Sequence, residues 1–259
     1  MLAIERRNKI LTILREDKHV VVNELAKTFE VSEETIRRDL DKLEKEGFVV
    51  KTYGGAVINE GNEVELPYIV RKKSNVEAKK KIADIVAELV SDGDSLILDA
   101  SSTAVFIAQK IKSKKDITLI TNSIEVLMEL SDVSGWKILS TGGALKERSC
   151  ALFGSQAEES LSRFHVDKAF ISCKGVDRIH GFSDSNDMHA AVKRKMLEAS
   201  SKIYFAVDSS KFDQLSFISV SGFSEVDAVV TDREPTAEWS NIFAANGVKC
   251  LYPEGAKDE

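Results

Sequence analysis

The stretch that decides the first part of the fold is VSEETIRRDLDKLEKE, which runs from Val31 to Glu46. Read at the helical period, its apolar residues Ile36, Leu40 and Leu43 fall on one face. Ser32 is a preferred N-cap residue, and the two acids that follow it suit the positive end of the helix dipole. The pattern therefore predicts a short amphipathic helix, which ends at the next glycine.

The polar face of this helix carries two adjacent arginines, Arg37 and Arg38, close to Thr35. Side chains of this kind can hold a phosphate and read a guanine base from a single helical turn. A solvated surface helix would show the same mixture of acids and bases. The flanking segments have to decide between these two interpretations.

The flanking segments favour DNA binding. Helices are predicted over 3–16 and 22–30, so the quoted helix is the second element of a helix-turn-helix, which enters the major groove. The segment 48–58 alternates and then breaks at Gly54 and Gly55, which predicts a β-hairpin with positive φ at both glycines. Together these elements predict a winged helix of about 55 residues. Its expected DNA contacts are Ser32, Thr35, Arg37, Arg38, Lys42, Lys51 and Tyr53.

Composition limits how such a head can bind DNA. The chain of 259 residues has a formal net charge of −6, with 43% hydrophobic and 30% charged residues. Residues 1–58 hold 11 basic and 11 acidic residues, so the remainder carries the whole deficit. A broad basic surface is therefore excluded, and DNA contact has to come from local clustering, to which Arg6 and Arg7 could add.

Other residue types exclude several classes of protein. The three cysteines, Cys150, Cys173 and Cys250, are scattered without CxxC spacing, and the four histidines show no metal-ligand spacing. We expect no metal and no cofactor. No apolar run reaches the length of a membrane span, and the N-terminus lacks the apolar core of a signal peptide. A cytoplasmic protein with no membrane partner is expected.

The rest of the chain predicts an α/β domain. A polar linker is expected over 59–75, and a helix that starts at Val76 opens a domain over 76–253, followed by a tail over 254–259. Short apolar runs then alternate with helical patterns, which predicts a Rossmann-like parallel sheet covered on both faces. The expected strands are 95–99, 117–121, 137–141, 168–172, 203–208, 228–232 and 249–252. The expected helices lie near 103–112, 124–130, 155–162, 189–200 and 237–245.

Ligands of such sheets bind at the carboxyl ends of the strands, where this chain places polar residues. The loop from Asp99 to Thr103 opens a helix, so its amides and hydroxyls could bind a phosphate. Alternatively, Ser102 is only an N-cap and the double glycine at Gly143 only a turn. Lysines at this edge suit a phosphate, and carboxylates suit sugar hydroxyls. The candidate ligand residues are Asp99, Ser101, Ser102, Thr103, Asn122, Gly143, Lys174, Asp177, Asp184, Asp208 and Lys211.

These motifs resemble those of the DeoR family of bacterial transcription regulators. In the head, Arg6, Ile10 and Leu14, followed by Ser32 and the run Thr35–Leu40, are similar to the family signature. The strand-end motifs resemble the family's effector domain, and this similarity adds Lys193 to the ligand candidates. The resemblance implies a fold similar to sugar-phosphate isomerases, and a sugar-phosphate sensor coupled to a head that binds double-stranded operator DNA.

A finer resemblance concerns regulators of deoxysugar use, among them activators of L-fucose operons. It rests on Leu98–Thr103, Ser172–Asp177 and Asp184–Asn186. It implies a deoxyketose 1-phosphate as effector. Many family members carry Glu near the position of His189, and a solvent-facing helix residue is the simplest interpretation of this histidine.

Two functions from different classes follow. The first is a DNA-binding regulator of a sugar catabolic operon, acting as a homodimer or homotetramer on a two-fold operator. Family habit favours repression, and the fucose-like motifs leave activation open. The second is a sugar-phosphate isomerase or a bifunctional protein, in which Asp177 or Asp208 would be a base beside Lys211. The head has no purpose in a simple isomerase, so we assign no catalytic residue and expect no enzyme.

Overall fold

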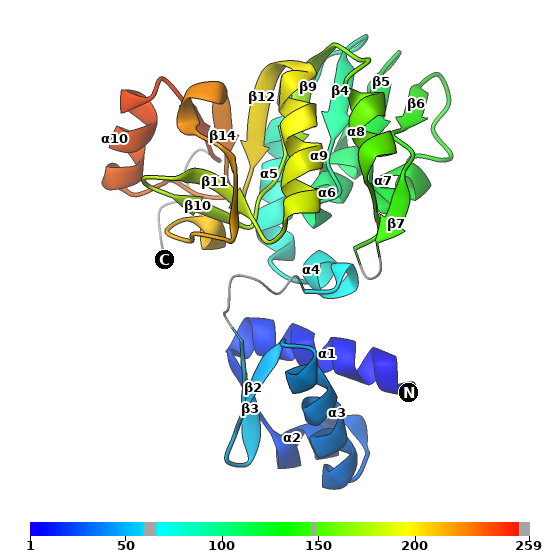
Figure 1. Ribbon diagram of the computed structural model, residues 1–259, viewed down its shortest axis with the longest axis vertical. Helices are drawn as coiled ribbons and strands as arrows, with labels where there is room; N and C mark the ends of the chain where they lie inside the picture. Colours follow the sequence, from blue (N-terminus) through cyan, green and yellow to red (C-terminus); the bar gives the residue numbers. More distant parts are fainter. Residues whose placement is uncertain (60–65, 147–148, 254–259) are drawn as a thin grey trace. The chain divides into compact units, whose positions relative to one another are not determined.

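The computed structural model describes residues 1–59, 66–146 and 149–253, and divides the chain into two compact units, Met1–Ser74 and Asn75–Glu259 (Figure 1). Residues 60–65 of the predicted linker and the predicted tail over 254–259 lie outside the described residues. Within the described chain, no helix has both the length and the apolar character that a membrane span requires.

The first unit has the predicted winged-helix elements. Its strands form an antiparallel sheet of order β1-β3-β2, in which β3 is central. Buried apolar side chains, among them Leu14, Leu25 and Leu40, join the helices to this sheet. The elements of this unit are α1 (Ala3–Asp17), β1 (His19–Val21), α2 (Val22–Phe29), α3 (Glu33–Lys45), β2 (Val49–Thr52), β3 (Gly55–Ile58) and α4 (Tyr68–Lys73).

The hairpin turn corrects one expectation. Gly54 has a φ of +85°, whereas Gly55 does not have a positive φ. Gly55 is constrained by packing instead, because a Cβ atom there would lie 1.9 Å from the backbone oxygen of Val20. Strand β1, which the sequence analysis missed, makes this close approach. A glycine that leaves room for a neighbouring strand resembles a turn glycine in the sequence.

Part of the predicted linker is packed against the first unit. Tyr68 and Val70 of α4 are buried, α4 contacts α1, and Val70 belongs to the core of this unit. The helix has only six residues, which is too short for a period to be recognised among its charged neighbours.

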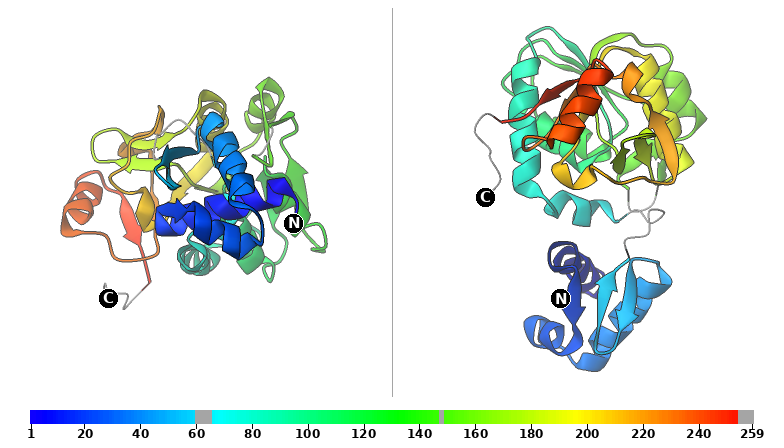
Figure 2. Two further views of the ribbon diagram at one scale, coloured as in Figure 1. Left: turned by 90° about the horizontal axis from the view of Figure 1, so that it is seen from below. Right: turned by 90° about the vertical axis from the view of Figure 1, so that its left-hand side faces the viewer.

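The second unit contains a seven-stranded parallel sheet of order β15-β14-β12-β9-β4-β5-β6, and each of its strands lies where the sequence predicted one. Helices α5 and α6 cover one face, and α8 and α9 cover the other (Figures 1 and 2). The strands are β4 (Ser95–Leu98), β5 (Thr118–Thr121), β6 (Lys137–Ser140), β9 (Val166–Ile171), β12 (Ser200–Ala206), β14 (Ala228–Val230) and β15 (Lys249–Leu251). The helices are α5 (Val76–Leu89), α6 (Ser102–Ile111), α7 (Ile124–Glu129), α8 (Ser155–Leu161), α9 (Asp187–Glu198) and α10 (Ala237–Ala245).

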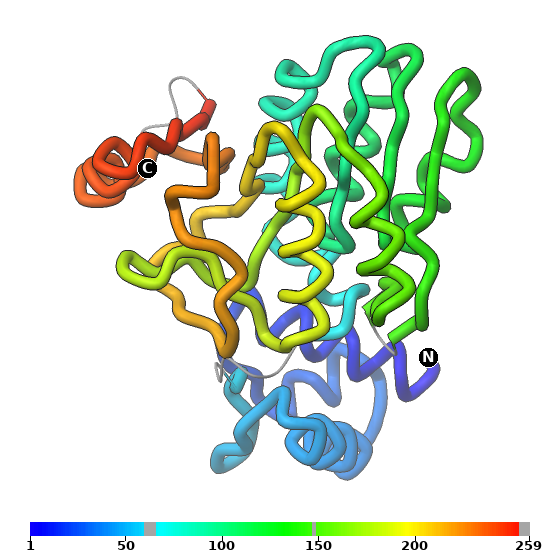
Figure 3. Tube along the Cα trace, turned by 45° about the horizontal axis from the view of Figure 1, so that its top comes forward, coloured from blue at the N-terminus to red at the C-terminus, as the bar shows by residue number. Residues whose placement is uncertain are grey.

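Two small antiparallel sheets, which the sequence analysis missed, complete this unit, and their path can be followed in Figure 3. One has the order β10-β11-β13, and the other is the hairpin β7-β8. All five strands have three or four residues, too few for a clear alternation. They are β7 (Ala144–Lys146), β8 (Ala151–Phe153), β10 (Gly175–Asp177), β11 (Gly181–Asp184) and β13 (Ile218–Ser221), with two 3-10 turns, η1 (Ser209–Lys211) and η2 (Phe223–Glu225).

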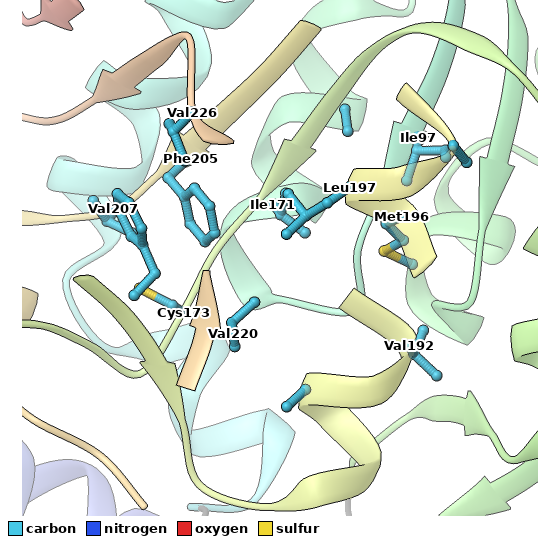
Figure 4. Close-up of a cluster of buried hydrophobic side chains, with 14 of the residues drawn as sticks. Ile97, Ile171, Cys173, Val192, Met196, Leu197, Phe205, Val207, Val220 and Val226 are labelled. Carbon is cyan, nitrogen blue, oxygen red and sulfur yellow. The ribbon is translucent and has the colours of Figure 1, made fainter. Parts of the chain in front are cut away.

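The core between the large sheet and α9 holds that helix in place (Figure 4). Val192 and Met196 of α9 belong to the same buried cluster as Ile97 and Ile171 of the sheet. The rings of Phe182 and Phe205 stack with centroids 3.8 Å apart, which joins β11 to the sheet. Because Lys193 directly follows Val192 in α9, the packing of Val192 also fixes the position of Lys193.

Candidate functional site

The helix α3 begins as predicted. The Ser32 hydroxyl oxygen accepts a hydrogen bond from the backbone N–H of Thr35 at 3.2 Å, so Ser32 is the N-cap. The two hydroxyl groups also lie 2.9 Å apart. Both side chains are therefore engaged in ordering the first turn of the helix.

The basic residues expected to contact DNA are exposed, and each is paired with an acid. Arg37 bonds to Glu33 at 2.7 Å and Arg38 bonds to Glu34 at 3.3 Å. Lys42 lies 3.5 Å from Glu46, and Lys51 of β2 lies 2.5 Å from Asp41. Tyr53, at the tip of the hairpin, is fully exposed. The predicted DNA-contact residues thus share an accessible surface of α3 and the wing.

Two arginines near the N-terminus do not join that surface. Arg6 is buried and donates from Nε to Asp39 at 2.5 Å, while Arg7 lies 3.4 Å from the same carboxylate. The suggestion that Arg6 could add to a DNA-binding cluster is therefore wrong. Arg6, a residue of the family signature, instead joins α1 to the buried side of α3. The sequence motif does not reveal this burial.

In the second unit, three polar positions meet at the carboxyl edge of the sheet. Asp99 follows β4, Asn122 follows β5 and Ser172 follows β9. The three strands are neighbours, with Leu98 in register with Thr121 and with Phe170. The predicted convergence of these strand ends is therefore present in the fold.

A buried group of charges lies at this edge. The Lys193 ammonium donates to Asp184 Oδ2 at 2.5 Å and to the carbonyl oxygen of Ser172 at 2.6 Å. It also lies 3.4 Å from Asp99 Oδ2. Asp99 in turn accepts from the backbone N–H groups of Ser101 and Ser172 at 3.1 and 3.0 Å. We call Asp99, Asp184 and Lys193 the buried charge cluster.

The pKa values of Asp184 and Lys193 favour their charged states. Burial raises the pKa of Asp184, but the charge of Lys193, with further interactions, outweighs burial and brings that pKa to about 2. Burial lowers the pKa of Lys193, and the two carboxylates outweigh it and raise the pKa above its ordinary value. The nearby Cys173 thiol has its pKa raised to about 12, chiefly by burial. Asp184 and Lys193 therefore stay ionised near neutral pH, while Cys173 stays a thiol.

The loop that leaves β4 forms the N-terminal end of α6. The Ser101 hydroxyl accepts from the backbone N–H of Ala104 at 3.0 Å, so Ser101 and not Ser102 is the N-cap. The alternative interpretation of Ser102 as a cap is thus wrong. Ser102 and Thr103 are buried in the first helical turn. Amides at such a position attract anions.

Asn122 lies next to this loop in the strand order and is 3% exposed. Its Nδ2 donates to the carbonyl oxygen of Leu152 at 3.0 Å, which fixes the amide group. Among the residues that the structure describes, no donor forms a hydrogen bond with its buried Oδ1. An unsatisfied buried acceptor is costly, so it points to a ligand or a water molecule at this position.

A second polar cluster surrounds the turn after β12. Asp208 Oδ1 accepts from Asn75 Nδ2 at 3.0 Å and from the backbone N–H of Ser210 at 3.1 Å. Burial raises the pKa of Asp208, and the charges of Lys211 and Lys79, with the bonds from Ser210, lower it overall. Asp208 and Lys211 are thus neighbours as predicted, at the start of α5.

Other predicted ligand residues have separate surroundings. Asp177 ends β10 opposite Gly181, whereas Gly175 at the other end of this hairpin pairs with Ser183 beside Asp184. The Asp177 carboxylate accepts from the backbone N–H of His180 at 2.9 Å, so it closes the β10–β11 turn. It is therefore not brought into the buried charge cluster.

Gly143, Lys174 and His189 also have definite places in the fold. A Cβ atom on Gly143 would lie 2.5 Å from the backbone oxygen of Phe153, which explains the glycine by close packing of β8. The backbone N–H of Lys174 donates to Ser183 at 3.0 Å. His189 is buried against the ring of Phe153, with centroids 4.5 Å apart, so the solvent-facing interpretation is wrong. Helix α9 also packs against α8 and β8.

Three contributors were missed by sequence reasoning. Asn75 lies in the stretch predicted as a linker, Lys79 of α5 was not among the candidates, and Ser172 takes part mainly through its backbone. No sequence signal marks the first and third of these roles. The hint of the second is that Lys79 stands at helical spacing from the apolar residues Ile82 and Val86, on the buried side of α5.

Two family models together match most of the chain. The model of the DeoR-like helix-turn-helix domain matches residues 6–62, and the model of the DeoR C-terminal sensor domain matches residues 74–233. A solved structure of ribose 5-phosphate isomerase A from Methanocaldococcus jannaschii is 19% identical, with a TM-score of 0.41, and the match covers 55% of this chain and 57% of that one.

Curated relatives match along nearly their whole length. The uncharacterised HTH-type regulator YulB of Bacillus subtilis is 43% identical over 90% of both chains. The HTH-type repressor GlcR of the same organism is 36% identical over 96% of both chains. The L-fucose operon activator of Haemophilus influenzae is 35% identical over 88% of this chain and 91% of its own, which confirms the finer resemblance. By these matches and by its winged helix and parallel sheet, the chain belongs to the DeoR family of transcriptional regulators.

Proposed function

We propose that this DNA-binding regulator controls a sugar catabolic operon, and that a phosphorylated sugar bound by the second unit changes its affinity for the operator. The proposal rests on two features that follow neighbouring strands. One is the N-terminus of α6, and the other is Asn122, whose buried Oδ1 has no hydrogen-bond donor among the described residues. The first feature suits a phosphate, and the second suits a sugar hydroxyl.

The phosphate subsite is proposed at the Asp99–Thr103 loop. Here the amides and hydroxyls of Ser102 and Thr103 lie in the first turn of a ten-residue helix. The Asp99 carboxylate is already occupied by the amides of Ser101 and Ser172, so it shapes the loop. Lys193 is likewise held by Asp184 and Ser172. We therefore propose that the buried charge cluster supports the subsite and that the loop itself meets the phosphate.

The sugar is proposed to lie across this loop, between Asn122, which follows β5 on one side of β4, and the turn that holds Lys211, which follows β12 on the other side. Support comes from the order of the strand ends at one sheet edge and from the lowered pKa of Asp208, which keeps that turn charged. Lys174, next to the same strand ends, is a further candidate. The resemblance to the L-fucose operon activator favours a deoxyketose 1-phosphate over other sugar phosphates.

Control of the operator requires two states of the protein. A ligand shifts an equilibrium only if it binds the two states unequally, so the effector has to prefer either the state that binds DNA or the state that does not. We propose a homodimer or homotetramer, because paired recognition helices match the two half-sites of a two-fold operator. Relatives include both a repressor and an activator, so the effector could either release or strengthen DNA binding.

The effector proposal is tested with pairs of sugars that differ only in the phosphate. L-fuculose 1-phosphate, fructose 1-phosphate and ribose 5-phosphate are each compared with the free sugar by thermal shift and calorimetry. A ligand that binds the folded chain at 100 times its Kd adds about 2.7 kcal/mol to the free energy of unfolding. Stabilisation by free sugars alone would overturn the phosphate subsite.

A conservative variant locates the subsite. Thr103→Val keeps the shape of a buried residue but removes its hydroxyl, and we expect it to weaken binding of the phosphorylated sugar about 5- to 10-fold, as loss of one hydrogen bond does. Thr118→Val, at the opposite end of β5, is the matched control and should leave the Kd unchanged. Equal effects of both variants would argue against the loop as the subsite.

The DNA side is tested on α3. Arg37→Ala should weaken specific operator binding by about 1 to 3 kcal/mol, the usual cost of losing a bidentate base contact. The measurement is a titration with an operator duplex that the wild-type chain selects from a library of random duplexes. Unfolding of the variant is followed as a control. Undiminished binding would remove Arg37 from the interface.

The isomerase alternative receives less support. A base that abstracts a proton beside a carbonyl works best with a pKa near neutral pH. The pKa of Asp177 is lowered, chiefly by the hydrogen bond from the His180 backbone, which together with other contacts outweighs burial. The pKa of Asp208 is lowered as well. We propose that the chain is not an enzyme. Exchange of solvent deuterium into any sugar phosphate of the panel would contradict this.

A further inference from the structure

The recognition surface of the first unit carries its own counter-charges. Four bases on α3 and the wing, Arg37, Arg38, Lys42 and Lys51, each form an ion pair with an acid of the same unit. Two of these acids, Glu33 and Glu34, occupy the first turn of α3. Before DNA binds, these four bases are therefore already paired with acids and do not form a row of free positive charges.

The two first-turn pairs contribute little to stability. The side chains of Arg37 and Glu33 are 54% and 49% exposed, and those of Arg38 and Glu34 are 78% and 63% exposed. Ion pairs in water at this exposure are weak and easily exchanged. Acids in the first turn also interact favourably with the helix dipole, but glutamine there would still permit the helix. These two acids should affect DNA binding more than stability, because the phosphates of an approaching DNA compete with them for the arginines.

We propose that Glu33 and Glu34 are specificity-determining residues, which hold Arg37 and Arg38 in ion pairs and so weaken binding to DNA that lacks the operator sequence. On random DNA, an arginine gains only a phosphate contact, so the loss of even a weak ion pair offsets part of that gain. On the operator, a bidentate contact with guanine replaces the ion pair, because its geometry rewards the planar guanidinium. The acids therefore penalise the wrong sequence more than the right one.

This inference rests on the proposed binding of an operator by α3. It agrees with the neutral balance of residues 1–58, in which 11 bases face 11 acids. A regulator with a net charge of −6 gains nothing from bulk attraction to DNA, so discrimination depends on these local pairs. A different role for the same acids would be acceptance of a hydrogen bond from cytosine N4. The two roles predict opposite effects on the operator.

The experiment uses Glu33→Gln and Glu34→Gln in the full chain. The wild-type chain first selects an operator from a library of random duplexes, and each protein is then titrated with that duplex and with a random duplex of equal length. Freeing one arginine for a phosphate should raise affinity for the random duplex about fivefold at physiological salt, with a salt slope steeper by about 1. Affinity for the operator should change less than twofold, so the specificity ratio falls about fivefold per variant.

Glu16→Gln is the matched control, since it removes the same charge from an exposed position on α1 of the same unit. It should alter neither affinity by more than twofold. Thermal unfolding of each variant checks that α3 remains folded. Random-duplex affinities equal to that of Glu16→Gln would overturn the inference. Loss of operator affinity in the acid variants would also overturn it, because the acids would then be reading bases. Failure of the wild type to select any duplex would overturn the proposed operator binding itself.

Discussion

The two units use the same kind of interaction, an ion pair between a base and an acid, in opposite ways. On α3, Arg38 and Glu34 are exposed, lie one turn apart in the sequence and meet at 3.3 Å. In the second unit, Lys193 and Asp184 are less than 10% exposed, come from different elements and meet at 2.5 Å. Water competes for the first pair but not for the second. Pairs of the first kind can be exchanged for DNA, whereas the second kind holds strand ends and α9 in one arrangement.

Burial, and not membership of a unit, makes this difference. The first unit also contains a buried pair, since Arg6 and Asp39 have side chains that are 9% and 5% exposed. Thus each unit has at least one inaccessible ion pair where elements are joined. The following predictions test this contrast from the largest expected effect to the smallest.

The largest effect is expected at the buried charge cluster. Lys193→Met leaves Asp99 and Asp184 without their common cation, and we expect the free energy of unfolding of the second unit to fall by about 3 to 5 kcal/mol. Chemical denaturation measures it. Lys195→Met, which removes a lysine two positions along α9 with a side chain 34% exposed, is the control and should cost less than about 1 kcal/mol. Equal costs would show that burial is not the deciding factor.

A smaller effect is expected at the buried pair of the first unit. Asp39→Asn keeps the size of the side chain but removes its charge from Arg6 and Arg7, and should lower the free energy of unfolding of this unit by about 1.5 to 3 kcal/mol. Asp41→Asn, whose partner Lys51 is exposed, provides the comparison on the same helix. If Asp41→Asn proved the more damaging of the two, the contrast would be reversed.

Acid titration gives an independent measure of the cluster. The pKa of Asp184 is about 2, below its ordinary value of 3.8, so this group adds stability that is present above about pH 4 and is lost as the pH falls toward 2. The shift corresponds to about 2 kcal/mol. The difference in unfolding free energy between wild type and Asp184→Asn should therefore shrink between pH 5 and pH 2. A difference that stayed constant over this range would mean that Asp184 is not stabilised as a carboxylate.

The smallest effect on stability is expected at the exposed pairs. Arg38→Ala should change the free energy of unfolding by less than about 0.5 kcal/mol, because an exposed i,i+4 pair contributes no more than this. Thermal unfolding measures the change. A loss above 1 kcal/mol would show that these pairs are structural, and exchange with DNA would then be costly.

The elements that could be predicted from sequence are those with local signals. The helix α3 was predicted because its apolar spacing and its Ser32 cap are properties of one short stretch. The seven strands of the large sheet were predicted because each is an apolar run between polar loops. Strands β1 and β10 were missed, because β1 runs directly into α2 with no turn between them and β10 is a Gly-Val-Asp stretch instead of an apolar run.

The candidate site was only partly predictable. The sequence placed Asp99, Asn122 and Asp208 after strands, which is enough to bring them to one edge of a parallel sheet. It did not show that Asp177 lies at the far end of a small hairpin or that His189 is buried. Strand order and helix packing decide these points, and both depend on contacts between distant residues.

The sequence by itself determined that this protein has a winged-helix head and an α/β body of the DeoR family, because periodicity, capping residues and motif spacing are local properties of the chain. Only the tertiary structure decided which charges are available. Arg6 and Lys193 look like Arg37 and Lys42 in the sequence, but the first two are enclosed by packed elements and bonded to buried carboxylates. Whether a charge faces water depends on what the rest of the chain places around it, and this is what separates the residues that support the fold from those that can meet a ligand.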